Sequence, residues 1–291
     1  MYDQLSAARR VLWLGAHKTG TTFLQGILDA SADALAQAGV AYMNLDTFRD
    51  KYTRPLLFDN FEEAPAPASE FPIGSSKTIL FDENIPGLVQ NAVSADVGLY
   101  PQLEERVGAV VDHLDYTPDL ILFGIRRLDG YLPSLYCETL KSTPFRPFLE
   151  FMEHVPKGLL WHPMLVRLAR MYPGVPLVVY LAEELRGHER AFLSALTGVP
   201  VPALHIDNSR ERPGFSQKAI NRLKALSQTR PVVRQDVGQM IREFPKSADN
   251  PGFAPFGAQR QERFKTLYAQ DRSLIQKDAQ MDLLDLSIFD S

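Results

Sequence analysis

The feature that most constrains this chain is a short apolar segment followed at once by a glycine-bounded loop. Residues 11–14 are apolar on both faces, which predicts a buried central strand. Gly15 and Gly20 bound the loop. Apolar side chains then recur at helical spacing, which predicts a helix over residues 21–38 that stops at Gly39. Strand, loop and helix in this order place the loop at the N-terminus of the helix.

The loop combines several features that favour binding of an anion. Its glycines have the spacing of the phosphate-binding pattern G-x-x-x-x-G-K-[ST], with Thr22 in the final place. Thr21 stands where that pattern has lysine, and the lysine of this loop is Lys18. Free N–H groups and the helix dipole favour negative charge at a helix N-terminus, and a lysine in the loop adds positive charge. The alternative is a tight turn before a helix, without a ligand.

The run His-Lys-Thr-Gly-Thr-Thr at residues 17–22 closely resembles the loop of a bacterial sulfotransferase family. The resemblance implies an enzyme that takes a sulfuryl group from 3′-phosphoadenosine 5′-phosphosulfate (PAPS). It also implies that the 5′-phosphosulfate of PAPS is held by Gly15, His17, Lys18, Thr19, Gly20, Thr21 and Thr22. Lys18 is then expected to neutralise charge on the leaving phosphate during in-line displacement at sulfur.

A second anion site is expected at the end of a later strand. Residues 120–125 are strongly apolar and are followed by Arg126 and Arg127. In open α/β sheets, ligands bind beyond the carboxyl ends of the strands. Sulfotransferases have an arginine directly after a strand and a serine eight residues later, both directed at the 3′-phosphate of PAPS. The resemblance assigns these roles to Arg126 and Ser134, whereas Arg127 fits the spacing less well. The alternative is a pair of surface salt bridges and a helix-capping serine.

Transfer to a hydroxyl or an amine needs a group that accepts the proton. Glu83 follows a predicted strand over residues 78–81. Phe-Asp-Glu at a strand end resembles the region of the catalytic glutamate in glycosaminoglycan sulfotransferases and some bacterial ones. Glu83 is therefore the expected base, and Asp82 is the second choice. His17 either contacts the sulfuryl group or caps the loop. The alternative for Glu83 is a helix N-cap or a salt bridge.

A basic segment begins near residue 208 and contains Arg212. Many sulfotransferases have a basic, glycine-containing loop late in the chain that binds the 3′ end of the nucleotide. This resemblance adds Arg212 to the expected cofactor-binding residues, and a solvated helix face is the alternative. The expected acceptor is a small molecule or a carbohydrate, and a lipid is also open.

Predicted strands alternate with helices through the first 200 residues. Besides residues 11–14, strands are expected at 40–43, 78–81, 120–125 and 177–181. The alternation predicts an α/β fold with a mostly parallel central sheet flanked by helices, as in P-loop NTPases. Residues 201–291 contain no predicted strand and are expected to form helices, notably over 217–227 and 259–277. A single domain over residues 1–291, with its core at 11–200 and a helical C-terminal extension, accounts for this order.

Composition limits the classes of protein that remain. The chain has 291 residues, of which 45% are hydrophobic and 23% are charged, as in ordinary soluble domains. Its formal charge of −4 gives no support for binding nucleic acid or a membrane surface. The single cysteine, Cys137, excludes an internal disulfide and a cysteine metal cluster. No apolar run approaches the roughly 20 residues that span a bilayer, and a cytoplasmic location is expected.

Two other functions share the same fold class. A P-loop kinase acting on a small molecule would need a carboxylate at a strand end to hold Mg²⁺. Residues 120–125 are followed by arginines instead, and Asp82 and Glu83 are the nearby carboxylates. No metal is expected for sulfuryl transfer, and no cluster has the spacing of zinc ligands. A non-catalytic nucleotide-binding protein that keeps the loop is the third possibility.

Overall fold

The central sheet has six parallel strands in the order β2-β3-β1-β6-β7-β8. The computed structural model describes residues 2–58, 61–73, 75–206 and 214–289. The strands are β1 (Arg10–Trp13), β2 (Val40–Tyr42), β3 (Lys77–Phe81), β6 (Leu120–Ile125), β7 (Leu177–Leu181) and β8 (Met281–Leu283). The predicted α/β fold with a parallel sheet flanked by helices is therefore confirmed, and it is consistent with a P-loop NTPase-like fold.

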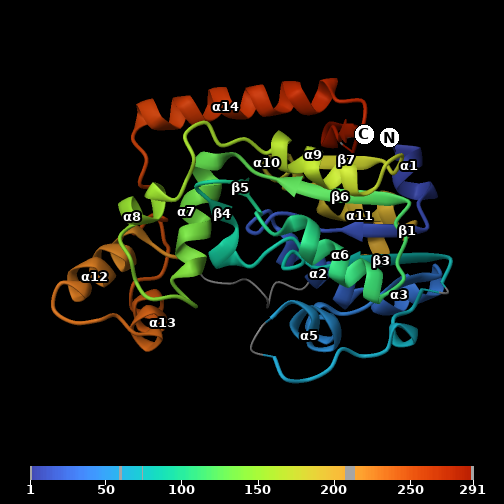
Figure 1. The fold of residues 1–291 in the computed structure, drawn as a ribbon, viewed down its shortest axis with the longest axis horizontal. Helices are drawn as coiled ribbons and strands as arrows, with labels where there is room; N and C mark the ends of the chain where they lie inside the picture. The colour runs from blue at the N-terminus through green and yellow to red at the C-terminus, as the bar shows by residue number, and fades with distance from the viewer. Residues whose placement is uncertain (1, 59–60, 74, 207–213, 290–291) are drawn as a thin grey trace.

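Helices cover both faces of the sheet, because successive side chains of a strand point to opposite faces (Figure 1). In β6, Leu120 and Leu122 pack into one core, whereas Ile121, Phe123 and Ile125 pack into the other. The first core is covered by α1 (Tyr2–Ala7), α2 (Thr21–Ala30), α3 (Ala32–Gln37) and α11 (Glu189–Thr197). The second core is covered by α6 (Leu103–His113), α7 (Leu128–Thr139), α9 (His162–Met171) and α14 (Ala258–Lys277).

Shorter elements fill the connections between the strands. Between β2 and β3 the chain forms α4 (Leu45–Phe48), the π-helical turn η1 (Arg49–Thr53) and α5 (Arg54–Leu57). Other short elements are η2 (Ala68–Glu70), η3 (Val89–Asn91), the antiparallel pair β4 (Val93–Ser94) and β5 (Gly98–Leu99), α8 (Phe148–Glu153), α10 (Ala182–Leu185), η4 (Val201–Ala203) and η6 (Leu286–Phe289).

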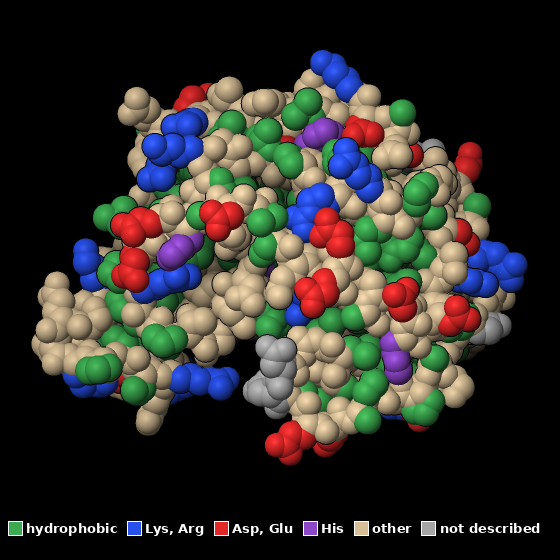
Figure 2. Space-filling view, viewed as in Figure 1, with side chains coloured by type: hydrophobic (Ala, Val, Ile, Leu, Met, Phe, Trp, Pro, Cys, Tyr) green, Lys and Arg blue, Asp and Glu red, His purple; other side chains and the backbone are tan. Residues whose placement is uncertain are grey.

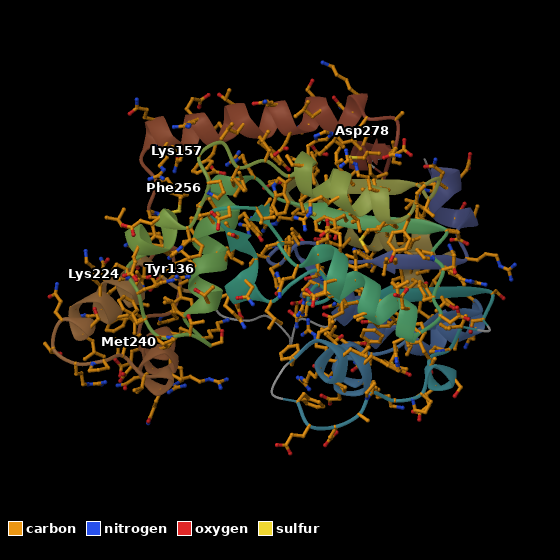
Figure 3. All side chains as sticks on the ribbon, in the orientation of Figure 1. Tyr136, Lys157, Lys224, Met240, Phe256 and Asp278 are labelled. Atoms are coloured by element: carbon orange, nitrogen blue, oxygen red, sulfur yellow. The ribbon has the colours of Figure 1, made fainter. Side chains whose placement is uncertain are left out.

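The C-terminal helices α12 (Gln217–Ser227) and α13 (Arg234–Glu243) form a lobe at one end of the molecule, beyond α7 and α8 (Figure 1). Two antiparallel bridges close the base of this lobe. Tyr136 of α7 packs against Phe253, with 5.6 Å between the ring centroids. Figure 3 shows Tyr136 on the side of α7 that faces the lobe. Aromatic packing therefore attaches the C-terminal part to the helix that follows β6.

Two expectations about secondary structure were wrong. The last third does contain a strand, β8, which pairs in parallel with β7. β8 has three residues, of which only Met281 is buried, so it carries too little pattern to be recognised. The helix expected over 21–38 is two helices that meet at Ser31. After β7 the chain forms α10 and α11, with Gly187 between them at a φ of +94°.

The position of β1 in the sheet creates a crevice for a ligand. After β1 the chain builds β2 and β3 on one side of it and then crosses to β6 on the other side. The loops after β1 and β6 therefore leave the sheet in different directions at the same edge, where ligands of open α/β sheets bind.

On the face of the molecule that Figure 2 shows, the charged side chains are not gathered in one area. Figure 2 shows basic and acidic side chains interspersed over one face of the molecule. Within the described ranges, no helix combines the length and the apolar character needed to cross a lipid bilayer.

Candidate functional site

The loop after β1 is held in a tight conformation that uses three positive φ angles. They are +60° at Gly15, +66° at Lys18 and +87° at Gly20. A Cβ atom at Gly15 would lie 3.1 Å from the side chain of Thr21, so a glycine fits this turn. Backbone hydrogen bonds from residues 14 and 16 to β6, of 3.1 and 3.0 Å, attach the start of the loop to the sheet.

Consecutive backbone N–H groups of the loop are free of protein acceptors. Within the described part of the chain, no oxygen accepts a hydrogen bond from the N–H of residues 18–22. Thr19 and Thr21 are nevertheless almost fully buried. Buried N–H groups are normally paired, and a row of them at a helix N-terminus is a ready anion site. The hydroxyl of Thr19 donates to the carbonyl of Ala16 at 2.6 Å, so it shapes the loop instead of facing a ligand.

His17 is buried and bonded on both sides of its ring. Nδ1 lies 2.9 Å from the hydroxyl of Tyr100, which also accepts the backbone N–H of His17 at 3.0 Å. Nε2 lies 3.0 Å from the side-chain amide of Asn84. With its amide nitrogen donating to Nε2, Asn84 can also accept from Arg49 at 3.0 Å, which satisfies both of its ends. Burial lowers the pKa of His17, so the ring is neutral at pH 7. Of the two expected roles, these contacts favour support of the loop.

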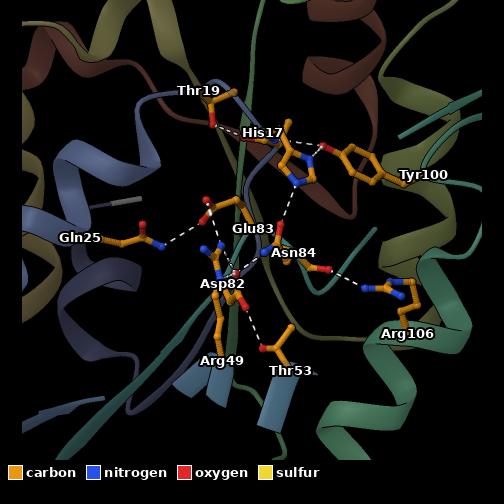
Figure 4. A network of polar contacts seen from close by, with 11 residues as sticks. His17, Thr19, Gln25, Arg49, Thr53, Asp82, Glu83, Asn84, Tyr100 and Arg106 are labelled. Carbon is orange, nitrogen blue, oxygen red and sulfur yellow. Dashed lines mark hydrogen bonds and ion pairs between the residues drawn. The ribbon is translucent and has the colours of Figure 1, made fainter. Parts of the chain in front are cut away.

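Glu83 and Asp82 follow β3 and share one arginine. Arg49 pairs with Asp82 at 2.6 Å and with Glu83 at 3.1 Å, as Figure 4 shows. The second carboxylate oxygen of Glu83 accepts from Gln25 of α2 at 3.0 Å. Burial alone would raise the pKa of Glu83, but the charge of Arg49 and the hydrogen bond from Gln25 oppose burial and help to lower it. Glu83 is therefore ionised beside the loop, whereas Asp82 is fully buried.

Lys18 forms an ion pair with Glu138, which was not expected from the sequence. Its Nζ lies 3.1 Å from Glu138 of α7, and Lys141 lies 2.8 Å from the same carboxylate oxygen. Burial opposes ionisation of Glu138, but the two lysines together lower its pKa. The carboxylate of Glu138 is thus paired with the lysine that is expected to bind an anion in the loop.

Arg126 extends from the end of β6 directly to the loop. Its Nη1 donates to the backbone carbonyl of Lys18 at 2.9 Å. Gly130, in the first turn of α7, makes room for it, because a Cβ atom there would lie 3.2 Å from the guanidinium. The backbone carbonyl of Arg126 accepts from the indole of Trp161 at 2.8 Å. Two backbone contacts therefore fix the arginine beside the loop.

Ser134 and Arg127 occupy different surroundings. Ser134 is half-buried in α7, which begins at Leu128, so it lies beyond the first turn of the helix, where N–H groups lack intrahelical partners. Its side chain nevertheless lines the same cavity as Arg126. Arg127 pairs with Asp129 at 2.6 Å and does not line this cavity.

Three cavities meet at the loop, and Lys18 lines all of them. The first has a volume of about 660 Å³ and includes His17 and Glu83. The second, of about 260 Å³, contains Arg126 and Ser134. The third, of about 310 Å³, lies between the loop and the end of β7. The residues expected at the two ends of one ligand therefore line neighbouring cavities that share Lys18.

The site residues predicted from the sequence did not include every residue at the site, and one of them lies outside the residues that the structure describes. The structure brings together the loop, Glu83, Arg126 and Ser134, whereas Arg212 lies outside the described residues. Sequence reasoning missed Arg49, Gln25 and Glu138. Gln25 lies one turn into the helix after the loop, so a polar residue in an apolar stripe was a usable signal for it.

Comparisons with known proteins do not place this chain in a family. No protein-family model, curated protein or solved structure matches it. The fold and the site therefore define a class only: an α/β protein with a glycine-bounded loop between its first strand and the following helix.

Proposed function

We propose that this protein is a sulfotransferase that moves a sulfuryl group from PAPS to a hydroxyl or amine of an acceptor. The contact between Arg126 and the Lys18 carbonyl carries the proposal, because it joins two anion-binding elements. A nucleotide with phosphate groups at both its 5′ and 3′ ends matches that arrangement. An ordinary nucleoside triphosphate has no 3′-phosphate for the second element.

The described residues fit such a nucleotide at both ends. The free N–H groups of residues 18–22 suit the 5′-phosphate, and the guanidinium of Arg126 suits the dianionic 3′-phosphate through its planar donors. Ser134 adds a hydroxyl in the same cavity. Phe23 lines two of the three cavities and offers an aromatic face to a base.

PAPS supplies an activated sulfuryl group on a phosphate leaving group, so that the S–O bond to this phosphate breaks as sulfur forms a bond to the oxygen or nitrogen of the acceptor. Glu83 is the group that accepts the proton of the acceptor. Lys18 neutralises the charge that builds up on the leaving phosphate oxygen, once it exchanges Glu138 for the ligand. Binding at Arg126 fixes the nucleotide's orientation, which lowers the entropic part of the barrier.

The pairing of Arg49 disfavours a kinase. Asp82 and Glu83 follow β3 beside the loop and could bind Mg²⁺, but both already pair with this arginine. A cation bound there would first have to displace the buried guanidinium of Arg49. That displacement would break ion pairs that are shielded from water, which is energetically unfavourable. Sulfuryl transfer makes no such demand on these residues.

Isothermal titration calorimetry with adenosine 3′,5′-bisphosphate and with ATP–Mg²⁺ tests the proposal. Tighter binding of the bisphosphate is expected, and preference for ATP–Mg²⁺ would contradict the proposal. A radiolabelled sulfuryl donor, offered with a panel of sugars, amines and lipids, then tests transfer. Tight bisphosphate binding without transfer to any acceptor would favour a non-catalytic nucleotide-binding protein.

A further inference from the structure

Arg49 is a heavily paired side chain near the loop that sequence reasoning did not assign. It begins the π-helical turn η1, and its side chain is 13% exposed. Nε and Nη2 donate to the same oxygen of Asp82 at 3.0 and 2.6 Å. Nη2 also lies 3.1 Å from Oε1 of Glu83. One guanidinium therefore joins the two carboxylates that follow β3.

Asp82 serves as a fixed anchor for this arginine. Its side chain is fully buried, and its second oxygen accepts from the hydroxyl of Thr53 at 2.7 Å. Its first oxygen also accepts the backbone N–H of Asn84 at 2.9 Å. Figure 4 shows these donors surrounding the Asp82 carboxylate. Because Asp82 cannot turn without losing several hydrogen bonds, Arg49 cannot turn easily either.

Glu83 is held from two sides and keeps the capacity to accept a proton. Arg49 contacts Oε1, and Gln25 donates to Oε2 at 3.0 Å. A carboxylate has about four lone-pair positions, so each oxygen retains one after these contacts. Glu83 also lines the 660 Å³ cavity together with the loop.

We propose that Arg49 is a positioning residue: anchored on Asp82, it fixes the Glu83 carboxylate in the orientation from which it accepts the acceptor's proton. This inference rests on the proposed function. It assigns Arg49 no contact with the donor nucleotide. Its effect is confined to the half of the site that faces the acceptor.

The charges around Glu83 set the direction of the expected change. Arg49 and neutral His17 face it from η1 and the loop, Asp82 adjoins it, and the hydroxyls of Tyr100 and Tyr180 also lie within its electrostatic reach. Removing the arginine leaves burial and the charge of Asp82 to disfavour ionisation. The pKa of Glu83 should then rise, by about one unit or more.

The test compares Arg49→Gln with Arg49→Lys and with Arg54→Gln. Arg54 lies in the same helical segment but pairs with Asp50 on the surface, so its variant matches the chemical change without touching Glu83. For Arg49→Gln, the acid limb of the kcat/KM profile should move up by about one pH unit. Its kcat should fall about tenfold to a hundredfold, with bisphosphate affinity unchanged. Arg49→Lys should show a smaller pH shift, and Arg54→Gln none.

Carbon-13 NMR titration of the side-chain carboxylates, with Glu83→Gln to assign the signal, measures the same pKa without turnover. A higher Glu83 pKa in Arg49→Gln supports the inference. An unmoved acid limb or an unmoved carboxylate signal would overturn it, as would an equal shift in Arg54→Gln. Failure of the bisphosphate to bind would instead refute the proposed function, and the NMR result would still report on Arg49 and Glu83.

Discussion

The guanidinium of Arg126 donates a hydrogen bond to the backbone carbonyl of Lys18, with 2.9 Å between Nη1 and the oxygen. These residues are 108 positions apart and follow neighbouring strands, β1 and β6. The carbonyl belongs to Lys18, the non-glycine residue of the loop that adopts a left-handed conformation. Arg126 thus lies beside the loop and stabilises its conformation.

Replacing these two residues should separate their roles. Lys18→Ala should mainly lower kcat, because the charge of Lys18 matters most when the leaving phosphate develops charge. Arg126→Ala should mainly raise the KM for PAPS, because it removes a ground-state contact. Steady-state kinetics with PAPS as the varied substrate measures both effects. Near-normal constants in both variants would contradict the assignment of the site.

The left-handed conformation of Lys18 predicts a difference between two substitutions. Glycine adopts a φ of +66° without strain, whereas alanine retains the strain. Lys18→Gly should therefore be more stable than Lys18→Ala by about 1 kcal/mol. Urea unfolding of the two variants measures the free energy of unfolding, and both should lose turnover. Equal stability would show that the loop is not strained at this position.

Gly130→Ala should weaken nucleotide binding but stabilise the fold. A Cβ atom there would lie 3.2 Å from the Arg126 guanidinium, so Gly130→Ala should displace that side chain and weaken bisphosphate binding. Alanine in a helix should also stabilise the fold by about 0.5–1 kcal/mol.

Gly108→Ala is the matched control for that substitution. It lies inside α6, and its added Cβ would meet only an Asp112 oxygen at 4.0 Å. It should stabilise the fold without changing bisphosphate affinity. Calorimetry and thermal unfolding of both variants distinguish the effects. Equal binding by the two variants would contradict the role of Gly130.

Glu138 should compete with the nucleotide for Lys18. Glu138→Gln removes the negative charge at 3.1 Å from Nζ, so bisphosphate affinity should rise about twofold to fivefold. The gain should shrink at high salt, because both side chains are partly exposed. Titration of Glu262→Gln, which removes a surface charge on α14, gives the control. Weaker binding in Glu138→Gln would show that Glu138 contributes to the nucleotide site.

Local patterns were sufficient to predict the loop and the parallel sheet. The positions of Gly15 and Gly20 directly after an apolar strand depend on residues close in sequence, and so does that of Arg126 after β6. The apolar strands were recognisable because both of their faces are buried. β8 was missed because an edge strand of three residues carries almost no periodicity.

The partners of the charged residues could not be predicted from the sequence. Arg49 meets Asp82 from 33 positions away, through a π-helical turn that has no recognisable pattern. Glu138, in the last turn of α7, meets Lys18 from 120 positions away. Such pairs depend on the relative placement of whole elements, which local sequence patterns do not encode.

The most direct test of the account is the affinity of wild type and Arg126→Ala for two nucleotides, adenosine 3′,5′-bisphosphate and adenosine 5′-monophosphate. If Arg126 binds the 3′-phosphate, the variant should lose about tenfold or more in affinity for the bisphosphate, as expected for a charge-assisted contact. Its affinity for the monophosphate should stay close to that of wild type. An equal loss for both nucleotides, or no loss for either, would contradict the claim that the loop and Arg126 bind opposite ends of one nucleotide.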